Sequence, residues 1–372
     1  MKILIAPDKF KNSISATELA RIIRETISKF DATIRTEVHV LADGGEGSLS
    51  VLKSSIPLRK ELVKTLDPLG RPIESYYYTN PSNRDAYIEL AKASGLELLE
   101  PNEYNPMKTS TYGTGLLIRD AISQGVKRIF LFIGGSATND GGMGIAHALG
   151  IDFLDEKNNL LEPRGENLLK VKKVVKNAPL YAPGINITLL CDVDNILIGS
   201  NGAAHIFAQQ KGAKEYMVAD LEKGMINYCQ RIRQKTNIDV RNIRGSGAAG
   251  GIAASLIPLF EADIKSGIET LMEISNFEVA VKNSDIIISG EGSLDSQSLA
   301  GKVISGVAQQ CRKHKKKCIL FTGKSELSSD EIQYMGVQKV YSVLDYADNL
   351  KDAMCNVEQY IKRITLDYLK TL

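Results

Sequence analysis

Strand-sized apolar runs alternate with amphipathic segments along much of this chain, and the alternation restricts the folds it can adopt. Such runs occur at residues 2–6, 35–41, 285–289, 317–322 and 339–343, and a helical pattern extends from about Ser15 to Phe30. Ser15 and Glu18 form a capping-box pattern at the start of that helix. Strands that alternate with helices predict an α/β protein with a parallel sheet and helices on its faces.

The middle of the chain has a different pattern. Between about Val63 and Leu99, two β-like runs at 75–79 and 86–90 flank the turn at Asn80 and Pro81. Further strands are expected at 128–133 and 186–190, with helices near 113–124 and 143–149, and the first pattern resumes after Asn283. We therefore expect one parallel-sheet domain, residues 1–75 and 285–372, that is interrupted by an inserted α/β domain, residues 76–284.

Charge and cysteine content favour a small-molecule enzyme. Lys and Arg total 46 against 44 for Asp and Glu, so the formal charge of +2 does not favour a nucleic acid or an anionic membrane as partner. No run reaches the roughly 18 apolar residues of a membrane span, and the N-terminal run meets Pro7 and Asp8 too early for a secretory signal. The five cysteines contain no C-x-x-C pair, which suits a reducing cytoplasm.

A glycine-rich segment at 134–144 follows the apolar run 128–133 and carries the clearest chemical signal. Backbone N–H groups at such a strand-to-helix turn form a nest that attracts anions. We expect Gly135, Ser136, Thr138, Asn139 and Asp140 to bind phosphate or substrate. The alternative is a tight structural turn, which glycines alone would explain.

Two acidic segments indicate a divalent cation. Gly290 and Gly292 flank Glu291 in a loop expected directly after the strand 285–289, and Asp295 follows four residues later. Asp43 and Glu46 form a similar pair within residues 42–47. Carboxylates repel a polyphosphate unless a cation intervenes, so Asp43, Glu46, Glu291 and Asp295 are predicted Mg²⁺ ligands. Asp295 could instead cap a helix.

Further charged residues follow strand ends. Asp192 and Asp194 lie on one face of the extended segment after the strand 187–190, and we predict Asp192 as the base for a substrate hydroxyl. Asx turns are the competing explanation for both residues. Asp8, Lys9 and Lys11 follow the first strand, where a lysine can neutralise a phosphoryl group or a carboxylate.

One glycine pattern is only weak evidence for a dinucleotide-binding site. Residues 245–250 match G-x-G-x-x-G, but the preceding residues 239–244 make a poor strand. A helix start packed closely on a neighbouring segment is favoured over NAD binding. A G-x-x-x-x-G-K-[ST] loop is absent from the sequence, so a P-loop kinase of the usual form is excluded.

Taken together, these segments resemble the type I glycerate kinase family of bacteria. The resemblance extends over nearly the whole chain and rests on the motifs at 6–8 with 10–11, 42–47, 67–72, 111–115, 134–142, 191–204, 210–213, 247–251, 290–297 and 301–302. It implies a Rossmann-like domain interrupted by a second α/β domain, with the active site in the interdomain cleft. It also implies ATP and Mg²⁺ as cofactors and D-glycerate as substrate, phosphorylated at the C2 hydroxyl, although C3 phosphorylation is known among glycerate kinases.

Our hypothesis for the mechanism assigns roles to single residues. Mg-ATP would lie across the glycine-rich segments, Asp192 would orient or deprotonate the hydroxyl, and Lys11 or Lys302 would offset charge on the phosphoryl group, with Asp8 as a further candidate catalytic residue. Departures from the family pattern occur at Lys9, Asn12, Ile196 and Ser293, of which Ser293 replaces a usual Arg. Losing that Arg could shift substrate preference.

Other functions are also compatible with these residues. A kinase of the C3 hydroxyl or of a related hydroxy acid would use the same residues. A nicotinamide-dependent oxidoreductase would need no metal, and a metabolite sensor would bind glycerate without turnover.

Overall fold

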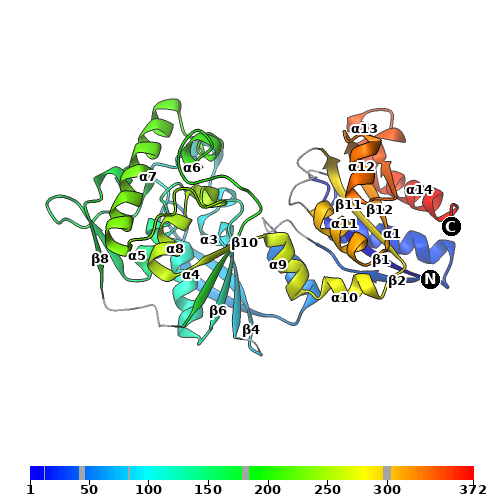
Figure 1. Cartoon of the computed structure of the whole chain (residues 1–372), viewed down its shortest axis with the longest axis horizontal. Helices are drawn as coiled ribbons and strands as arrows, with labels where there is room; N and C mark the ends of the chain where they lie inside the picture. Colours follow the sequence, from blue (N-terminus) through cyan, green and yellow to red (C-terminus); the bar gives the residue numbers. More distant parts are fainter. Residues whose placement is uncertain (12, 42–46, 83, 178–183, 296–302) are drawn as a thin grey trace. The chain divides into compact units, whose positions relative to one another are not determined.

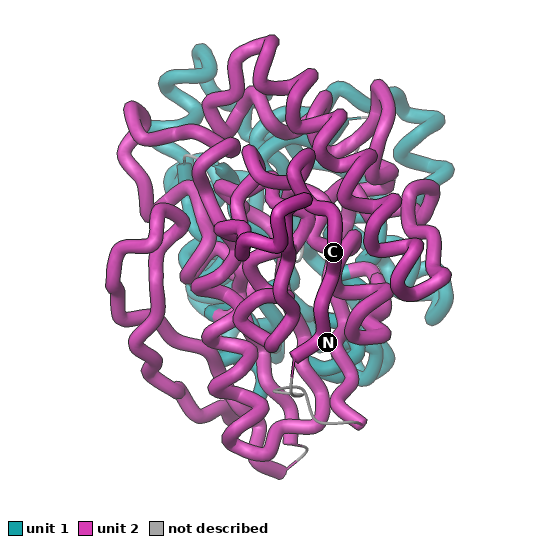
Figure 2. Tube along the Cα trace, turned by 90° about the vertical axis from the view of Figure 1, so that its left-hand side faces the viewer, with its two compact units in different colours: residues 1–43, 50–56, 267–372 teal, residues 44–49, 57–266 magenta. Residues whose placement is uncertain are grey.

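The chain divides into two compact units. The computed structural model describes residues 1–11, 13–41, 47–82, 84–177, 184–295 and 303–372. Unit 1 comprises residues 1–43, 50–56 and 267–372, and unit 2 comprises residues 44–49 and 57–266 (Figure 2). Unit 1 is therefore built from both ends of the chain, and unit 2 mainly from its middle.

Unit 1 contains a parallel sheet with the strand order β13-β12-β11-β1-β2 among the described residues. The strands are β1 Lys2–Pro7, β2 Arg35–Val38, β11 Ile286–Leu294, β12 Lys317–Ser325 and β13 Lys339–Ser342. β1 pairs with β11 from Ile3 opposite Ile286 to Pro7 opposite Gly290. The prediction that the two ends of the chain form one sheet is thus confirmed.

Helices cover both faces of this sheet (Figure 1). They are α1 Ala16–Phe30, α9 Gly267–Ile274, α10 Phe277–Lys282, α11 Val303–Lys313, α12 Ser329–Met335, α13 Leu350–Cys355 and α14 Val357–Leu369. The helix α2 Ser48–Ser55 begins in the unit 2 segment 44–49 and ends in unit 1. Ile3 and Ile5 of β1 pack with α1 and α14, whereas Leu4 packs with α9, α10 and α11. Neighbouring side chains of a strand point to opposite faces, and both faces of this strand are covered, so β1 is apolar from Ile3 to Pro7.

The start of α1 differs in one detail from the prediction. The Ser15 side chain accepts a hydrogen bond from the Glu18 backbone N–H at 3.2 Å, which is one half of the capping box. The Glu18 carboxylate binds Arg21 instead, at 2.6 and 2.9 Å. A charged partner one turn along the helix competes successfully with the neutral backbone N–H.

Unit 2 contains a mixed sheet with the order β10-β9-β6-β5-β4-β3 among the described residues. The strands are β3 Arg59–Leu66, β4 Pro72–Asn80, β5 Asp85–Glu89, β6 Arg128–Phe132, β9 Asn186–Leu190 and β10 Asp263–Lys265, and β7 Ile151–Leu154 pairs separately with β8 Lys173–Lys176. The strands β5, β6, β9 and β10 are parallel, and β3 and β4 are added antiparallel.

A large apolar core lies against this sheet. The helices α3 Ala91–Ser94, α4 Tyr112–Ser123, α5 Met143–Ala148, α7 Glu215–Thr236 and α8 Ala253–Phe260 contribute to it, and α6 Ala203–Phe207 packs with α7 in a smaller cluster. Ile88, Leu131 and Leu189, from three neighbouring parallel strands, are fully buried in this core. Within the described ranges, no helix is both long and apolar enough to cross a bilayer.

The junctions between the units differ from the predicted domain bounds. The sequence predicted them at 75/76 and 284/285, whereas the compact units change at 43/44, 49/50, 56/57 and 266/267. β3 pairs with β4 over eight residues, from Arg59 opposite Thr79 to Leu66 opposite Pro72. Because that hairpin is part of the second sheet, its first strand cannot belong to the first one.

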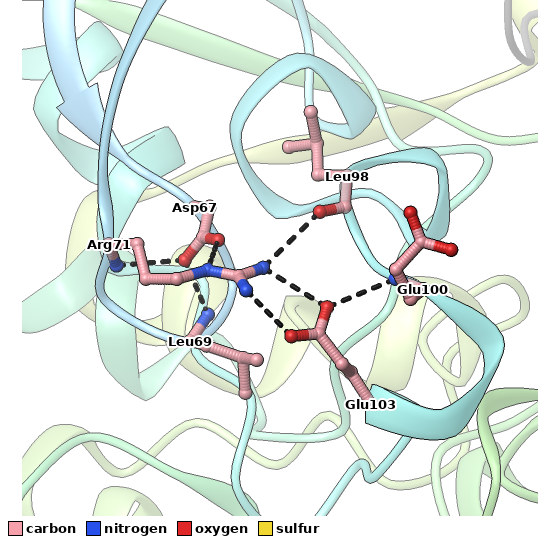
Figure 3. A network of polar contacts seen from close by, with 6 residues as sticks. All are labelled: Asp67, Leu69, Arg71, Leu98, Glu100 and Glu103. Atoms are coloured by element: carbon pink, nitrogen blue, oxygen red, sulfur yellow. Dashed lines mark hydrogen bonds and ion pairs between the residues drawn. The ribbon is translucent and has the colours of Figure 1, made fainter.

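The turn of this hairpin holds a polar network (Figure 3). The Asp67 carboxylate accepts hydrogen bonds from the backbone N–H groups of Leu69 and Arg71, both at 2.9 Å. The Arg71 guanidinium donates to Asp67 and to both carboxylate oxygens of Glu103, at 2.6 and 3.2 Å. This motif, one of those that carry the family resemblance, therefore ties the β3–β4 turn to the segment before α4.

Candidate active site

The parallel strands of unit 2 bring several predicted residues to one edge of the sheet. Glu89, Phe132, Leu190 and Lys265 lie in register at the carboxyl ends of β5, β6, β9 and β10. The glycine-rich segment and Asp192 follow two of these strands directly. Ligands of open α/β sheets bind at this edge, so the register places the predicted residues where such a site is expected.

Asp192 is anchored at this edge. It is half-buried after β9, and the Ser266 hydroxyl after β10 donates to its Oδ1 at 2.8 Å. That bond fixes the orientation of the carboxylate. Asp194 is exposed, so the two aspartates differ in environment although both follow the same strand.

The glycine-rich segment turns sharply between β6 and α5. Gly135, Gly141 and Gly142 have φ angles of 73°, 63° and 74°, in the left-handed region that favours glycine. A Cβ on Gly142 would lie 2.7 Å from the Ile252 carbonyl oxygen, so this position also needs glycine for close packing. The tight structural turn is thus present, and it accounts for these three glycines without a ligand.

Asp140 organises this turn from inside. Its side chain is fully buried and accepts four hydrogen bonds, from the N–H groups of Gly142, Gly144 and Thr111 at 2.8 to 3.1 Å and from the Thr111 hydroxyl at 2.8 Å. Burial raises the pKa of the Asp140 carboxyl, although these hydrogen bonds act in the opposite direction. Its oxygens stabilise the loop, and a direct contact of Asp140 with phosphate stays a prediction.

Ser136, Thr138 and Asn139 are all buried, with 6%, 0% and 1% of their surface exposed. The Ser136 hydroxyl and the Thr138 carbonyl oxygen accept hydrogen bonds from Lys211 Nζ at 2.7 and 2.8 Å. Neither amide atom of Asn139 has a hydrogen-bond partner among the described residues, and the same is true of the Thr138 hydroxyl. Such groups normally bind water or a ligand, because leaving them unpaired costs about 1–3 kcal/mol each.

The weak G-x-G-x-x-G pattern packs against this segment. A Cβ on Gly250 would lie 2.0 Å from the Thr138 carbonyl oxygen, and one on Gly247 would lie 2.2 Å from the Ile196 carbonyl oxygen. The Gly141 N–H also donates to the Gly250 carbonyl oxygen at 3.0 Å. The expectation of close packing is confirmed, and no strand precedes this turn within residues 237–244, so the βαβ context of a dinucleotide site is missing.

Glu291 lies in a strand, so the prediction of a loop at residues 289–295 is wrong for its first part. β11 continues to Leu294 and pairs with β12, with Glu291 opposite Thr322. The flanking glycines allow this, because a Cβ on Gly290 would lie 2.2 Å from the Phe321 carbonyl oxygen. Gly290 and Gly292 therefore serve close strand packing in this structure, and Glu291 is 7% exposed.

The end of β1 lies beside this extended strand. The Asp8 backbone N–H donates to the Gly290 carbonyl oxygen at 2.8 Å, and a Cβ on Gly292 would lie 3.2 Å from Phe10 Cα. The Asp8 carboxylate accepts from the Lys9 N–H at 2.7 Å, and Lys11 is exposed. The structure thus brings Asp8 and the Glu291 strand together at the carboxyl edge of the unit 1 sheet.

Three predicted residues, Asp43, Glu46 and Lys302, lie outside the described residues. Asp295 follows β11 and is half-buried. Among the residues that are described, no group of three or more His, Cys, Asp or Glu side chains could hold a metal ion. Glu291 and Asp295 offer carboxylate oxygens, the donor type that Mg²⁺ prefers, but the full set of ligands stays a prediction.

The sequence interpretation assigned no chemistry to two buried charged residues. Lys211 appeared only within a motif of the family resemblance, at 210–213. Glu89 ends β5, and its Oε1 accepts from the Leu49 N–H at 2.9 Å, while its Oε2 has no partner in the described part of the chain. Burial raises the pKa of the Glu89 carboxyl. Asp192 was selected because it follows the carboxyl end of a predicted strand, and the same criterion would have selected Glu89.

Similarity to known proteins identifies the family. The family described as "Glycerate kinase family" matches residues 3–372. The chain belongs to this family. Its members are kinases, that is, phosphotransferases with an alcohol group as acceptor.

Two relatives are similar in sequence to this chain over nearly its full length. The chain is 35% identical to the glycerate 2-kinase of Escherichia coli K12 over 373 residues, which cover 100% of this chain and 98% of that protein. It is also 35% identical to the glycerate kinase of Bacillus subtilis 168 over 368 residues, covering 99% and 96% of the two chains.

A solved structure confirms the α/β fold. The crystal structure of a protein provisionally assigned as glycerate kinase 2, from Salmonella typhimurium LT2, matches with a TM-score of 0.85 at 34% sequence identity. The match covers 100% of both chains.

Proposed function

We propose that this protein phosphorylates D-glycerate with ATP, at the C2 hydroxyl, to give 2-phosphoglycerate and ADP. The observation that supports this most is the full-length similarity to glycerate kinases, including the glycerate 2-kinase of E. coli. The glycine-rich segment after β6 adds physical support, because it combines left-handed glycines with buried polar groups at the ligand-binding edge of a sheet.

We assign the base role to Asp192. Phosphoryl transfer to an alcohol needs a carboxylate that orients the hydroxyl and accepts its proton. Asp192 follows β9 at the sheet edge, and Ser266 holds one of its oxygens at 2.8 Å. The other charged residues keep the roles proposed from the sequence, with Lys11 or Lys302 offsetting charge on the phosphoryl group and Asp8 as a further candidate catalytic residue.

We further propose Mg²⁺ as the cofactor, with Asp43, Glu46, Glu291 and Asp295 as its candidate ligands. When bound, Mg²⁺ would neutralise charge on the phosphate oxygens of ATP. Thr138 and Asn139 would bind phosphoryl or substrate oxygens through the groups that lack partners among the described residues, and Ser136 through its hydroxyl. Asp194, which is exposed after β9, would contact substrate.

Product analysis tests the proposal. The purified protein is incubated with ATP and D-glycerate, with and without Mg²⁺, and ADP release is followed while ³¹P NMR identifies the phosphorylated carbon. Metal-dependent 2-phosphoglycerate is the expected product. A 3-phosphoglycerate product would refute the C2 assignment, and turnover only with another hydroxy acid would refute the substrate.

The Asp192→Asn variant tests the base. We expect kcat to fall by at least about 100-fold, the low end for general-base catalysis, with an unchanged far-UV circular dichroism spectrum. Asp194→Asn is the matched control, because it changes an exposed aspartate two residues away and should lower kcat far less. Equal kcat values for the two variants would exclude Asp192 as the base.

A further inference from the structure

Lys211 is a lysine with only 2% of its surface exposed, in the short helix Gln209–Lys211 of unit 2. The chain reverses immediately after it, because Gly212 has φ of 90° and a Cβ there would lie 2.2 Å from the Tyr104 carbonyl oxygen. Lysine is among the residues least often fully buried without a charged partner. Its position therefore requires an explanation.

The amine of Lys211 is hydrogen-bonded to the glycine-rich segment. Nζ donates to the Ser136 hydroxyl at 2.7 Å and to the Thr138 carbonyl oxygen at 2.8 Å. An ammonium group has three N–H donors, so one remains without a protein acceptor among the described residues. A neutral amine could make the two observed bonds equally, and linking Ser136 to Thr138 therefore needs no charge.

The charge of this group is poorly compensated. Within the part of the chain that the structure describes, no carboxylate lies within 4 Å of Nζ. Among the described residues, the charged group that acts on Lys211 is Asp140, and its oxygens already accept four other hydrogen bonds. Burial accordingly lowers the pKa of Lys211 to about 7, with Asp140 acting in the opposite direction.

The neighbouring groups favour a negatively charged ligand. The spare N–H of Lys211 is accompanied by the Thr138 hydroxyl and the Asn139 amide, whose atoms are buried without partners among the described residues. Together they offer four N–H or O–H donors, one from Lys211, one from Thr138 and two from Asn139, and such donors can bind an oxyanion. A buried charge also acts on such a ligand without direct contact, because the interior screens it less than water does.

We propose that Lys211 is a positioning residue of the Ser136–Asn139 segment, and that an oxyanion bound at this segment draws a proton onto its amine. The shared chemistry is a carboxylate or a phosphoryl group, which the proposed function would supply as glycerate or ATP. By linkage, a ligand that binds the protonated form more tightly must cause proton uptake when it binds.

Calorimetry measures this uptake directly. Wild type, Lys211→Met and Lys214→Met are titrated with D-glycerate and, separately, with sulfate as a tetrahedral oxyanion, at pH 7.5 in buffers of different ionisation enthalpy. Neither probe titrates near this pH. Lys214, which is exposed three residues further on, is the matched control.

We expect wild type and Lys214→Met to take up about half a proton on binding, and Lys211→Met to take up none. The reason is that the pKa of Lys211, about 7 in the free protein, rises on binding, so that the amine becomes more protonated at pH 7.5. Lys211→Met should also bind the probe at least about tenfold more weakly. Uptake with D-glycerate identifies a carboxylate subsite, and uptake with sulfate a phosphoryl subsite. Equal uptake by wild type and Lys211→Met, or no uptake with either probe, overturns the proposal.

A second measurement avoids a variant that does not fold. Wild-type affinity for the same probe should fall by about tenfold between pH 6.5 and 8.5, and Ser136→Ala, which removes one Nζ acceptor, should alter this pH dependence while Lys214→Met preserves it. An affinity that does not change with pH contradicts the proposal. Proton uptake without phosphorylation of glycerate would refute the kinase assignment and still support the role of Lys211. Phosphorylation without proton uptake would support the kinase assignment and refute the role of Lys211.

Discussion

Gly250→Ala should destabilise unit 2 through a contact with the candidate site. Gly250 has φ of 68°, and a Cβ would lie 2.0 Å from the Thr138 carbonyl oxygen and 2.6 Å from Asn139 Cα. A left-handed alanine costs about 1–2 kcal/mol, and overpacking a core adds about 1–3 kcal/mol. We therefore expect a loss of about 2–5 kcal/mol in the free energy of unfolding.

A matched control separates these two contributions. Gly125 also has a positive φ, 81°, but a Cβ there would meet nothing within 4 Å. Gly125→Ala should therefore cost only the backbone contribution of about 1–2 kcal/mol. The difference between the variants, about 1–3 kcal/mol, measures the clash with the Thr138 carbonyl.

Urea unfolding followed by far-UV circular dichroism gives the two free energies. Because two compact units need not unfold together, hydrogen exchange of residues 134–150 is followed in parallel to identify the transition of unit 2. The same carbonyl accepts a bond from Lys211 at 2.8 Å, so Gly250→Ala should also lower kcat/KM more than Gly125→Ala does. Destabilisation of both variants by the same amount, within about 0.5 kcal/mol, would refute the packing argument.

Three further predictions concern Asp140, Gly290 and Lys211. Asp140→Asn should lower the free energy of unfolding by about 1–3 kcal/mol, because either amide orientation places a donor against a backbone N–H, and an unchanged urea midpoint would contradict this. Gly290→Ala should lower the free energy of unfolding by about 1–3 kcal/mol, because the new Cβ would lie 2.2 Å from the Phe321 carbonyl oxygen. Gly292→Ala, whose Cβ would have its nearest atom at 3.2 Å, should lower it less when thermal unfolding of the two variants is compared. For Lys211, the pKa of about 7 in the folded protein is below its ordinary 10.5, so the unfolded chain binds more protons between these values. The stability of wild type relative to Lys211→Met should then rise from pH 7 to 9, by up to about 1.4 kcal/mol per pH unit, and a constant difference would rule this out.

The alternation of strands and helices determined the fold class without any structural information. Apolar runs such as 2–6 and 285–289 have the length and composition of strands buried on both faces, and they pair in parallel as expected. Local patterns suffice here, because strand periodicity and helix capping depend on residues close in the chain. The same applies to the turn at 134–142, whose glycines and short polar residues indicated a sharp strand-to-helix connection.

Only the tertiary structure decided what individual polar residues do. The extension of β11 through Glu291 depends on pairing with β12, which lies more than 20 residues further along the chain. Asp140 is directed inward by donors from Thr111, and Lys211 is buried because it reaches Ser136 and Thr138, more than 70 residues before it. Burial and hydrogen-bond partners arise from long-range packing, and these set the charge and orientation of each group. The sequence could therefore indicate which residues carry chemistry, whereas their roles depend on contacts that no local pattern contains.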